Sequence, residues 1–220
     1  MVTTKTYRNE FIAVIAIYAN LVLVGIDNIL LYSDKVFIEA GLAPDQATFA
    51  TIGVFTLQLL SSAVGSKLVD RFGGFKVHVT ANVMIIIAHV TYTVSQVVTP
   101  IAPTAMPYIA IFAVGLFLVA WSGGTNLASF ALLGEITREP TRATAYGFAA
   151  VFFWAIAWVV GFVPPYLQIY LGAYALTIWL GCAVLFLIYV IVVIPRILRT
   201  RHLEDENQIS TEMKSLNEKA

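Results

Sequence analysis

The chain has 220 residues, of which 59% are apolar and 12% are charged, with a net charge of zero and a mean hydropathy of +0.83. Soluble domains contain roughly 45–50% apolar and about 25% charged residues, so this composition excludes a protein that buries its apolar side chains in one water-soluble core. The single cysteine, Cys182, excludes an internal disulfide and a cysteine metal cluster within the chain.

Long apolar stretches follow one another along the chain. A helix that crosses a membrane needs about 20 apolar residues, and the stretches that meet this length are about 11–32, 49–69, 77–98, 106–133, 145–166 and 173–194. They predict an all-α membrane protein whose six transmembrane helices form one bundle over residues 1–202. Residues 203–220 are polar and too few to build a core, so we expect a disordered cytoplasmic tail there.

Basic residues are concentrated at the two ends of the chain and in every second connection between the predicted helices. They include Lys5, Arg8, Lys67, Arg71, Lys76, Arg138, Arg142, Arg196, Arg199 and Arg201. The first connection is net acidic, and the third and fifth carry no charge. Connections rich in Lys and Arg stay in the cytoplasm, which predicts a multi-pass membrane protein with both termini cytoplasmic.

Polar side chains recur at helical spacing inside the predicted spans. Asn20 and Asp27 are seven residues apart and fall on one face of the first helix, and Gln58 belongs to a polar stripe on the second. In hydrocarbon such residues either join helices by hydrogen bonds or face a cavity. Asn82 and His89 of the third span favour helix-to-helix bonds, whereas the other stripes fit both interpretations.

The fourth predicted span contains the pair Gly123-Gly124, which can loosen or bend a helix. Polar residues surround the pair: Ser122, Thr125, Asn126 and Ser129. This span is therefore a second candidate wall of a polar cavity.

A run of residues at fixed spacings covers the end of the first predicted helix and the start of the second. It consists of Gly25-Ile26-Asp27-Asn28, Tyr32-Ser33, Phe37, Ala40-Gly41 and Ala50-Thr51-Ile52-Gly53. The run resembles the end of the seventh and the start of the eighth membrane helix of facilitative glucose transporters, in the sugar-porter branch of the major facilitator superfamily. The resemblance implies the C-terminal half of that transporter fold and a plasma-membrane location.

The resemblance also implies a substrate site, for which the candidate residues are Asp27, Gln58, Asn126 and Trp154. Asn, Gln and Trp suit a sugar because amides match hydroxyl groups and an aromatic face can pack on a pyranose ring. This chain departs from the family, since Leu21-Val22 replaces a Gln-Gln pair, Asp27 replaces an Asn, and segment 124–130 lacks the family's prolines. The predicted substrate is therefore a small polar solute, of which a hexose is one example.

Motifs at the cytoplasmic end follow the family more closely. Asp70-Arg71-Phe72-Gly73 resembles the loop between the eighth and ninth helices, and Glu135 and Arg142 match a glutamate and an arginine after the tenth. The resemblance implies that Asp70, Arg71, Glu135 and Arg142 form a cytoplasmic gate of ion pairs, the alternative being ordinary positive anchors. After Pro195 the family's Glu-Thr-Lys-Gly is replaced by Arg196-Ile197-Leu198-Arg199.

Transporters of this fold have two six-helix halves that rock about a substrate site at their interface. We therefore predict that the chain moves a small polar solute across a lipid bilayer by alternating access, together with an N-terminal half or a second copy of itself. We place a truncated gene first among the explanations for the missing half. The alternative function is that of a non-transporting, degenerate relative that binds or regulates another membrane protein.

No nucleophile with a base, no phosphate-binding glycine loop and no metal-ligand spacing is visible in the sequence. We therefore predict no enzymatic activity, no cofactor, no metal and no nucleic-acid partner.

Asp27 is the only acidic residue well inside a span, and we favour a hydrogen bond to a solute hydroxyl over proton coupling because no Arg or Lys lies near it within the spans. A structural role for Asp27, with Asn20 or a neighbouring helix as its partner, is the third possibility.

Overall fold

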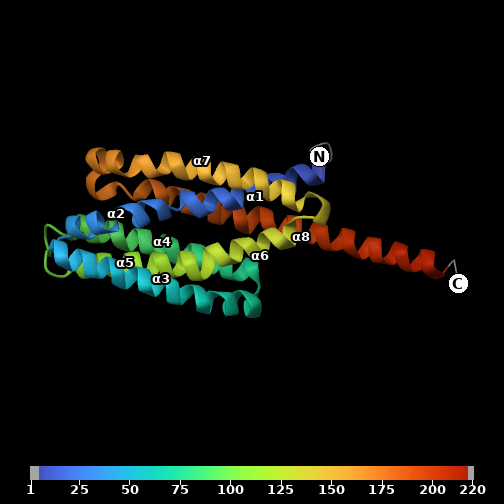
Figure 1. Cartoon of the computed structure of the whole chain (residues 1–220), viewed down its shortest axis with the longest axis horizontal. Coiled ribbons are helices and arrows are strands. Elements are labelled where there is room, and N and C mark those ends of the chain that lie inside the picture. The colour runs from blue at the N-terminus through green and yellow to red at the C-terminus, as the bar shows by residue number, and fades with distance from the viewer. Residues whose placement is uncertain (1–4, 218–220) are drawn as a thin grey trace.

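The structure is a computed structural model that describes residues 5–217. In chain order its elements are α1 (Lys5–Leu23), α2 (Ile26–Glu39), α3 (Pro44–Phe72), α4 (Gly74–Val98), α5 (Met106–Ala120), the π-helix η1 (Trp121–Asn126), α6 (Leu127–Ile136), α7 (Glu139–Leu171), the 3-10 turn η2 (Gly172–Tyr174) and α8 (Thr177–Asn217). In the described part of the chain, six helical segments are long and apolar enough to cross a membrane, which confirms the predicted all-α fold. The first segment consists of α1 and α2, and the fourth of α5, η1 and α6 (Figure 1).

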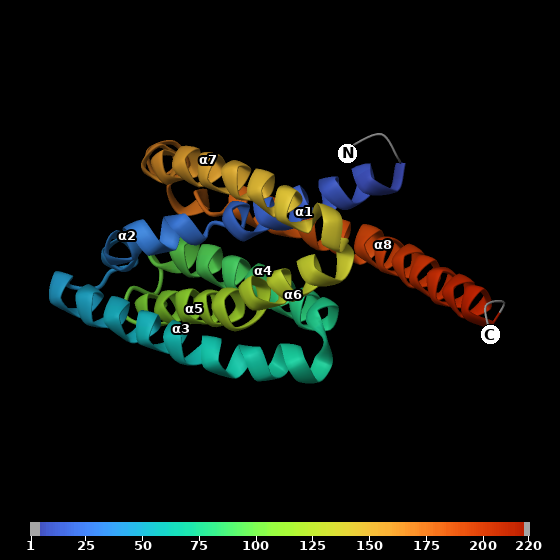
Figure 2. The ribbon, with the colours of Figure 1, turned by 45° about the vertical axis from the view of Figure 1, so that its right-hand side comes forward.

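The segments that carry the basic residues lie at one end of the bundle. They are the start of α1, the α3–α4 connection, the α6–α7 connection and the C-terminal part of α8 (Figure 1). The last of these projects beyond the other helices (Figure 2).

The sequence predicted a disordered tail from residue 203, but α8 continues as a helix through Asn217. No glycine or proline follows Pro195 in α8, so no residue there interrupts helical backbone geometry. Residues 218–220 of the predicted tail lie outside the described range.

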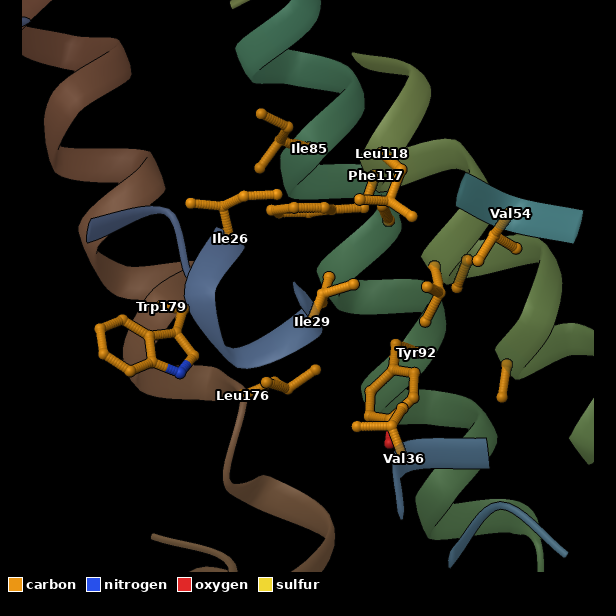
Figure 3. Close-up of a cluster of buried hydrophobic side chains, with 14 of the residues drawn as sticks. Ile26, Ile29, Val36, Val54, Ile85, Tyr92, Phe117, Leu118, Leu176 and Trp179 are labelled. Carbon is orange, nitrogen blue, oxygen red and sulfur yellow. The ribbon is translucent and has the colours of Figure 1, made fainter. Parts of the chain in front are cut away.

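Two clusters of buried apolar side chains fill the bundle. The first joins α2, α3, α4, α5 and α8 and includes Ile26, Val54, Ile85, Phe117 and Trp179 (Figure 3). The second joins α1, α6, α7 and α8 at the end that carries the basic residues. Together the clusters hold both halves of the two interrupted spans.

A network of polar side chains lies between the apolar clusters. Asn20 of α1 donates from Nδ2 to His78 Nε2 of α4 (3.2 Å) and to Asn82 Oδ1 (3.3 Å). Because Nε2 accepts, the neutral imidazole carries its proton on Nδ1, which lies 3.3 Å from Ser129 Oγ of α6. All four side chains are fully buried. The network therefore fastens α1 and α6 to α4, as expected of polar residues that join helices in hydrocarbon.

The first span is interrupted between α1 and α2, at Gly25, whose φ of +91° lies in the left-handed region that glycine adopts without strain. The interruption leaves carbonyl groups of α1 without helical partners. His89 Nε2 of α4 donates to the Val24 carbonyl oxygen (2.9 Å), and Trp121 Nε1 donates to the Leu21 carbonyl oxygen (3.0 Å). These bonds confirm the predicted helix-to-helix role of His89. Trp179 of α8 covers the turn, since a Cβ atom on Gly25 would approach its Cγ atom to 2.9 Å (Figure 3).

The fourth span is interrupted by η1, at the glycine pair that the sequence identified as a site of bending. A Cβ atom added to Gly65 of α3 would overlap the carbonyl group of Gly123, and one added to Gly124 would overlap Ala81 of α4. The small residues thus allow η1 to touch α3 and α4 through backbone atoms, as small residues do at membrane helix interfaces.

The approach of α3 to η1 generates a stability prediction. Gly65→Ala should destabilise the detergent-solubilised protein by about 1–3 kcal/mol, because overpacking forces the backbones of α3 and η1 apart. The matched control is Gly53→Ala on the same helix, where an added Cβ meets no atom within 4 Å. A thermal unfolding midpoint that falls for Gly65→Ala and is unchanged or raised for Gly53→Ala is the expected result. Equal midpoints for the two variants would contradict the close approach.

Candidate functional site

Asp27 lies in the first turn of α2, directly after the interruption of the first span. It is half-buried, and its Oδ2 atom is buried without a hydrogen-bond partner among the described residues. Free backbone N–H groups and the helix dipole at a helix N-terminus stabilise a negative charge. Asn20, which the sequence placed on the same face, belongs to α1 and bonds to α4. The interruption therefore separates the two residues and leaves the Asp27 carboxylate without the Asn20 partner that the sequence offered.

Gln58 lies on α3 where this helix packs against η1. Its backbone carbonyl accepts hydrogen bonds from the hydroxyl groups of Ser61, Ser62 and Ser122, the last of which belongs to η1. The hydroxyl groups of Ser62 and Ser122 also bond to each other. The half-buried side-chain amide of Gln58 forms no hydrogen bond within the described chain. Both its donor and its acceptor are consequently available to a solute.

Asn126 is the last residue of η1, and its half-buried side-chain amide also forms no hydrogen bond to a described residue. The other polar residues of this span are committed to packing. Ser122 bonds to α3, Ser129 belongs to the buried network, and Thr125 is fully buried. The structure therefore divides the polar residues of the fourth span into helix contacts and one available amide.

Trp154 lies on α7 and is 70% exposed. Its ring packs edge-on against Phe153, with ring centroids 5.3 Å apart, and Phe153 packs against Tyr18 of α1 at 6.1 Å. Tyr18 also contacts Phe130 of α6 and Tyr146 of α7. We call these five residues the aromatic cluster. From the sequence only Trp154 is predicted as a site residue, although Phe130 ends segment 124–130 of the span predicted to be a second wall of the cavity.

The four predicted site residues come from α2, α3, η1 and α7; α3 packs against α2 and η1, and α7 packs against α1 and α2. Gln58 and Asn126 lie on the α3 side, Trp154 lies on the α7 side, and Asp27 lies on α2 itself. The two cavities described within the chain lie elsewhere and are not lined by any of the four. None of the four side chains is therefore enclosed in either cavity, and we call the faces of α2, α3, η1 and α7 that carry them the surface around α2.

The predicted gate residues do not form one network in the described part of the chain. Arg142 pairs with Glu139 (Nη1 to Oε1, 2.7 Å) and donates to the carbonyl oxygens of Gly134 and Thr137 at the end of α6. A cation at a helix C-terminus interacts favourably with these carbonyl groups. Glu135 is exposed and takes part in no ion pair within the described residues. Arg142 is therefore held by its local backbone and by a neighbour that the sequence analysis did not name.

Asp70 and Arg71 are likewise exposed, and the guanidinium group of Arg71 lies 5.3 Å from the ring centroid of Phe72. The ion pair that does connect distant segments at this end joins Glu10 of α1 to Arg138, which precedes α7 (Oε1 to Nε, 3.3 Å). Glu10 is only 5% exposed. In the sequence Arg138 is one of several basic residues at the predicted cytoplasmic end, and nothing there connects it to Glu10, which is 128 residues away.

Among the described residues, no group of three or more His, Cys, Asp and Glu side chains is arranged to hold a metal ion. The candidate surface contains amides, hydroxyls, aromatic rings and one carboxylate. Such groups can exchange hydrogen bonds with a neutral polyhydroxylated solute and pack on its ring face.

Comparison with known proteins gives a consistent result over the whole bundle. A model of the family described as "Sugar (and other) transporter" matches residues 1–208. Facilitated glucose transporter member 7 of solute carrier family 2 from Mus musculus is 25% identical over 193 residues, which are 88% of this chain and 37% of that protein. Member 5 from Ovis aries is 26% identical over 216 residues, covering 95% of this chain and 41% of the relative. Member 3 from Canis lupus familiaris is 24% identical over 192 residues, which are 87% of this chain and 38% of that protein.

The chain thus spans about two fifths of the length of the curated relatives that it matches. The family match and the six apolar helices together identify a multi-pass membrane protein. Because that match includes nearly every described residue, the chain belongs to the sugar transporter family of the major facilitator superfamily.

Proposed function

We propose that this chain forms the C-terminal half of a carrier that moves a small neutral polar solute of the hexose class by alternating access. The observation that carries the proposal is the surface around α2, where the amides of Gln58 and Asn126 make no hydrogen bond to a described residue. A polar group exposed to hydrocarbon is costly. These amides therefore favour a water-filled, solute-binding cavity as their environment.

The two interrupted spans support the alternating-access part of the proposal. In transporters, discontinuous helices line the substrate site and supply half-helix ends to it. Asp27 follows the interruption of the first span, and Asn126 ends the interruption of the fourth. The cytoplasmic halves α1 and α6 are both fastened to α4 by the buried network, so we expect them to move with α4 as one body.

The proposal requires a second set of helices, because the surface around α2 supplies one wall only. We propose that an N-terminal half, or a second copy of this chain, supplies the other wall in the plasma membrane. Hydrogen bonds to a solute from one wall would leave its opposite hydroxyl groups without partners.

The function is tested by uptake into proteoliposomes. Residues 1–220 alone, as a demonstrated monomer, should give no saturable hexose uptake. Coexpression with the N-terminal half of a facilitative glucose transporter should give uptake of labelled hexose that unlabelled hexose inhibits. Gln58→Ala and Asn126→Ala should each raise KM about fivefold, since a hydrogen bond contributes about 1 kcal/mol. Gln46→Ala on the exposed first turn of α3 is the control. Saturable uptake by the monomer would overturn the need for a second half.

Asp27 provides a separate prediction for the coexpressed pair. Asp27→Asn should retain uptake because an amide oxygen still accepts a hydrogen bond from a solute hydroxyl, whereas Asp27→Ala should raise KM about tenfold, since a bond to a charged group contributes about 1.5–3 kcal/mol. The measurement is concentration-dependent uptake with and without an uncoupler. Accumulation that collapses with the uncoupler in the wild type and is absent in Asp27→Asn would instead assign a coupling proton to Asp27.

We also propose that the end of the bundle that carries the basic residues faces the cytoplasm. In a Cys182→Ala background, single cysteines at the exposed positions Asp45 and Thr104 should react with an impermeant maleimide in intact cells. A cysteine at Glu139 should react only after permeabilisation. The reverse labelling pattern would contradict the orientation derived from the charge distribution.

The competing function, a non-transporting membrane partner, is favoured by two observations. Leu21 and Val22, at the positions of the family's Gln-Gln pair, are buried in the apolar core, and the predicted gate residues form no common network within residues 5–217 that the structure describes. This alternative predicts copurification of the chain with a complete transporter and no uptake from any pairing of halves.

A further inference from the structure

A cavity of about 500 Å³ lies between the first turns of α1 and the C-terminal part of α8. Its walls include Asn9 and Ile12 from α1, and Tyr189, Val193, Arg196 and Arg201 from α8. We call it the α1–α8 pocket. None of the residues proposed to bind the transported solute contributes to it, so it calls for a separate explanation.

The lining of the α1–α8 pocket changes from apolar to cationic along the bundle. On α8 the residues recur every three or four positions and therefore form one stripe along the helix. Tyr189 and Val193 lie deeper in the span, and Arg196 and Arg201 lie in its last two turns, since the apolar segment runs from Thr177 to Arg201. Ile12 also lies deeper than Asn9 on α1. The pocket thus has an apolar inner part and a polar outer part at the membrane boundary.

The charges at the α1–α8 pocket favour an anion. Its carboxylate, Glu10, is paired with Arg138 and lies within electrostatic reach of Arg201, and Arg196 adds a third guanidinium group. Among the described side chains named here, three guanidinium groups therefore stand against one carboxylate. Arg196 is the first residue of Arg196-Ile197-Leu198-Arg199, which carries two positive charges where the resembling family has Glu-Thr-Lys-Gly with a net charge of zero.

We propose that the α1–α8 pocket binds an anionic phospholipid, with the phosphate-bearing headgroup at Arg196 and Arg201 and an acyl chain along Val193 and Tyr189. Guanidinium groups match phosphate oxygens in geometry and charge, and basic pockets between membrane helices at the cytoplasmic side are suited to lipid headgroups. An acidic protein segment would satisfy the arginines but would not need the apolar inner part. A lipid accounts for both parts of the pocket. The inference does not depend on transport, although it places the ligand in the leaflet at the end that carries the basic residues.

The binding test uses the full chain in a neutral detergent, with the thermal unfolding midpoint as readout, because a ligand of the folded state raises that midpoint. Dioctanoyl phosphatidylserine should bind at least fivefold more tightly than dioctanoyl phosphatidylcholine. Glycerophosphoserine, which has the same headgroup without acyl chains, should produce no shift at the same concentration. Equal affinity for the two lipids would overturn the proposal, and an equal shift with glycerophosphoserine would assign the pocket to a soluble anion and not to a lipid.

Variants then locate the binding. Arg196→Gln should weaken phosphatidylserine binding about fivefold, since a cation near an anionic lipid contributes about 1 kcal/mol. Arg199→Gln removes the same charge from an exposed position of α8 outside the pocket and should leave the affinity unchanged. The lipid-free midpoint of each variant reports whether it still folds. Equal losses in the two variants, or a shift of the wild type by a polyglutamate peptide as large as that by phosphatidylserine, would overturn a lipid site at this place.

Discussion

The hydrogen bonds that join α1, α4 and α6 are the interaction on which the rest of the bundle depends. In hydrocarbon a polar side chain has no water to bond with, so Asn20, His78 and Ser129 must find one another or carry the full cost of burial. Apolar contacts cannot fix one arrangement of membrane helices as strictly, because lipid chains are as apolar as leucine. The network lies between two apolar clusters and sets the relative register of three helices. Its position also fastens the two interrupted spans to the same neighbour.

An interrupted helix exposes backbone carbonyl groups, which cannot remain without partners inside a membrane. His89 and Trp121 solve this problem for the first span by donating to the carbonyl oxygens of Val24 and Leu21. Because Trp121 is itself the first residue of η1, the interruption of the fourth span is hydrogen-bonded to that of the first. A displacement at either interruption must therefore be accommodated at the other. This coupling is a physical basis for concerted movement of the two spans.

The sequence predicted the features that depend on composition and period, namely the six spans and the clustering of basic residues at one end. It could not place the interruption at Gly25. The broken helix is stabilised there by contacts with Trp179, His89 and Trp121, which form only in the folded bundle. The pairing of Arg142 with Glu139, by contrast, is a local contact between residues three apart in the first turn of α7, and the sequence could have predicted it; it was missed because the resemblance assigned Glu135 and not Glu139 to the gate. The helical tail was missed because a polar composition predicts solubility and not backbone conformation.

Burial differs greatly among the spans, and this difference bears on where a second half would sit. The most buried 18-residue windows belong to the first and fourth spans, at 61% and 56%, whereas those of α3 and α7 are each 11% buried. An exposed apolar face does not by itself indicate a protein partner in a membrane, because lipid covers it equally well. The side-chain amides of Gln58 and Asn126 are different, since lipid offers them no hydrogen-bond partner. Both lie on α3 and η1, which pack against each other, so water, a solute or another polypeptide must cover these amides; under the proposed function, the second set of helices would cover them.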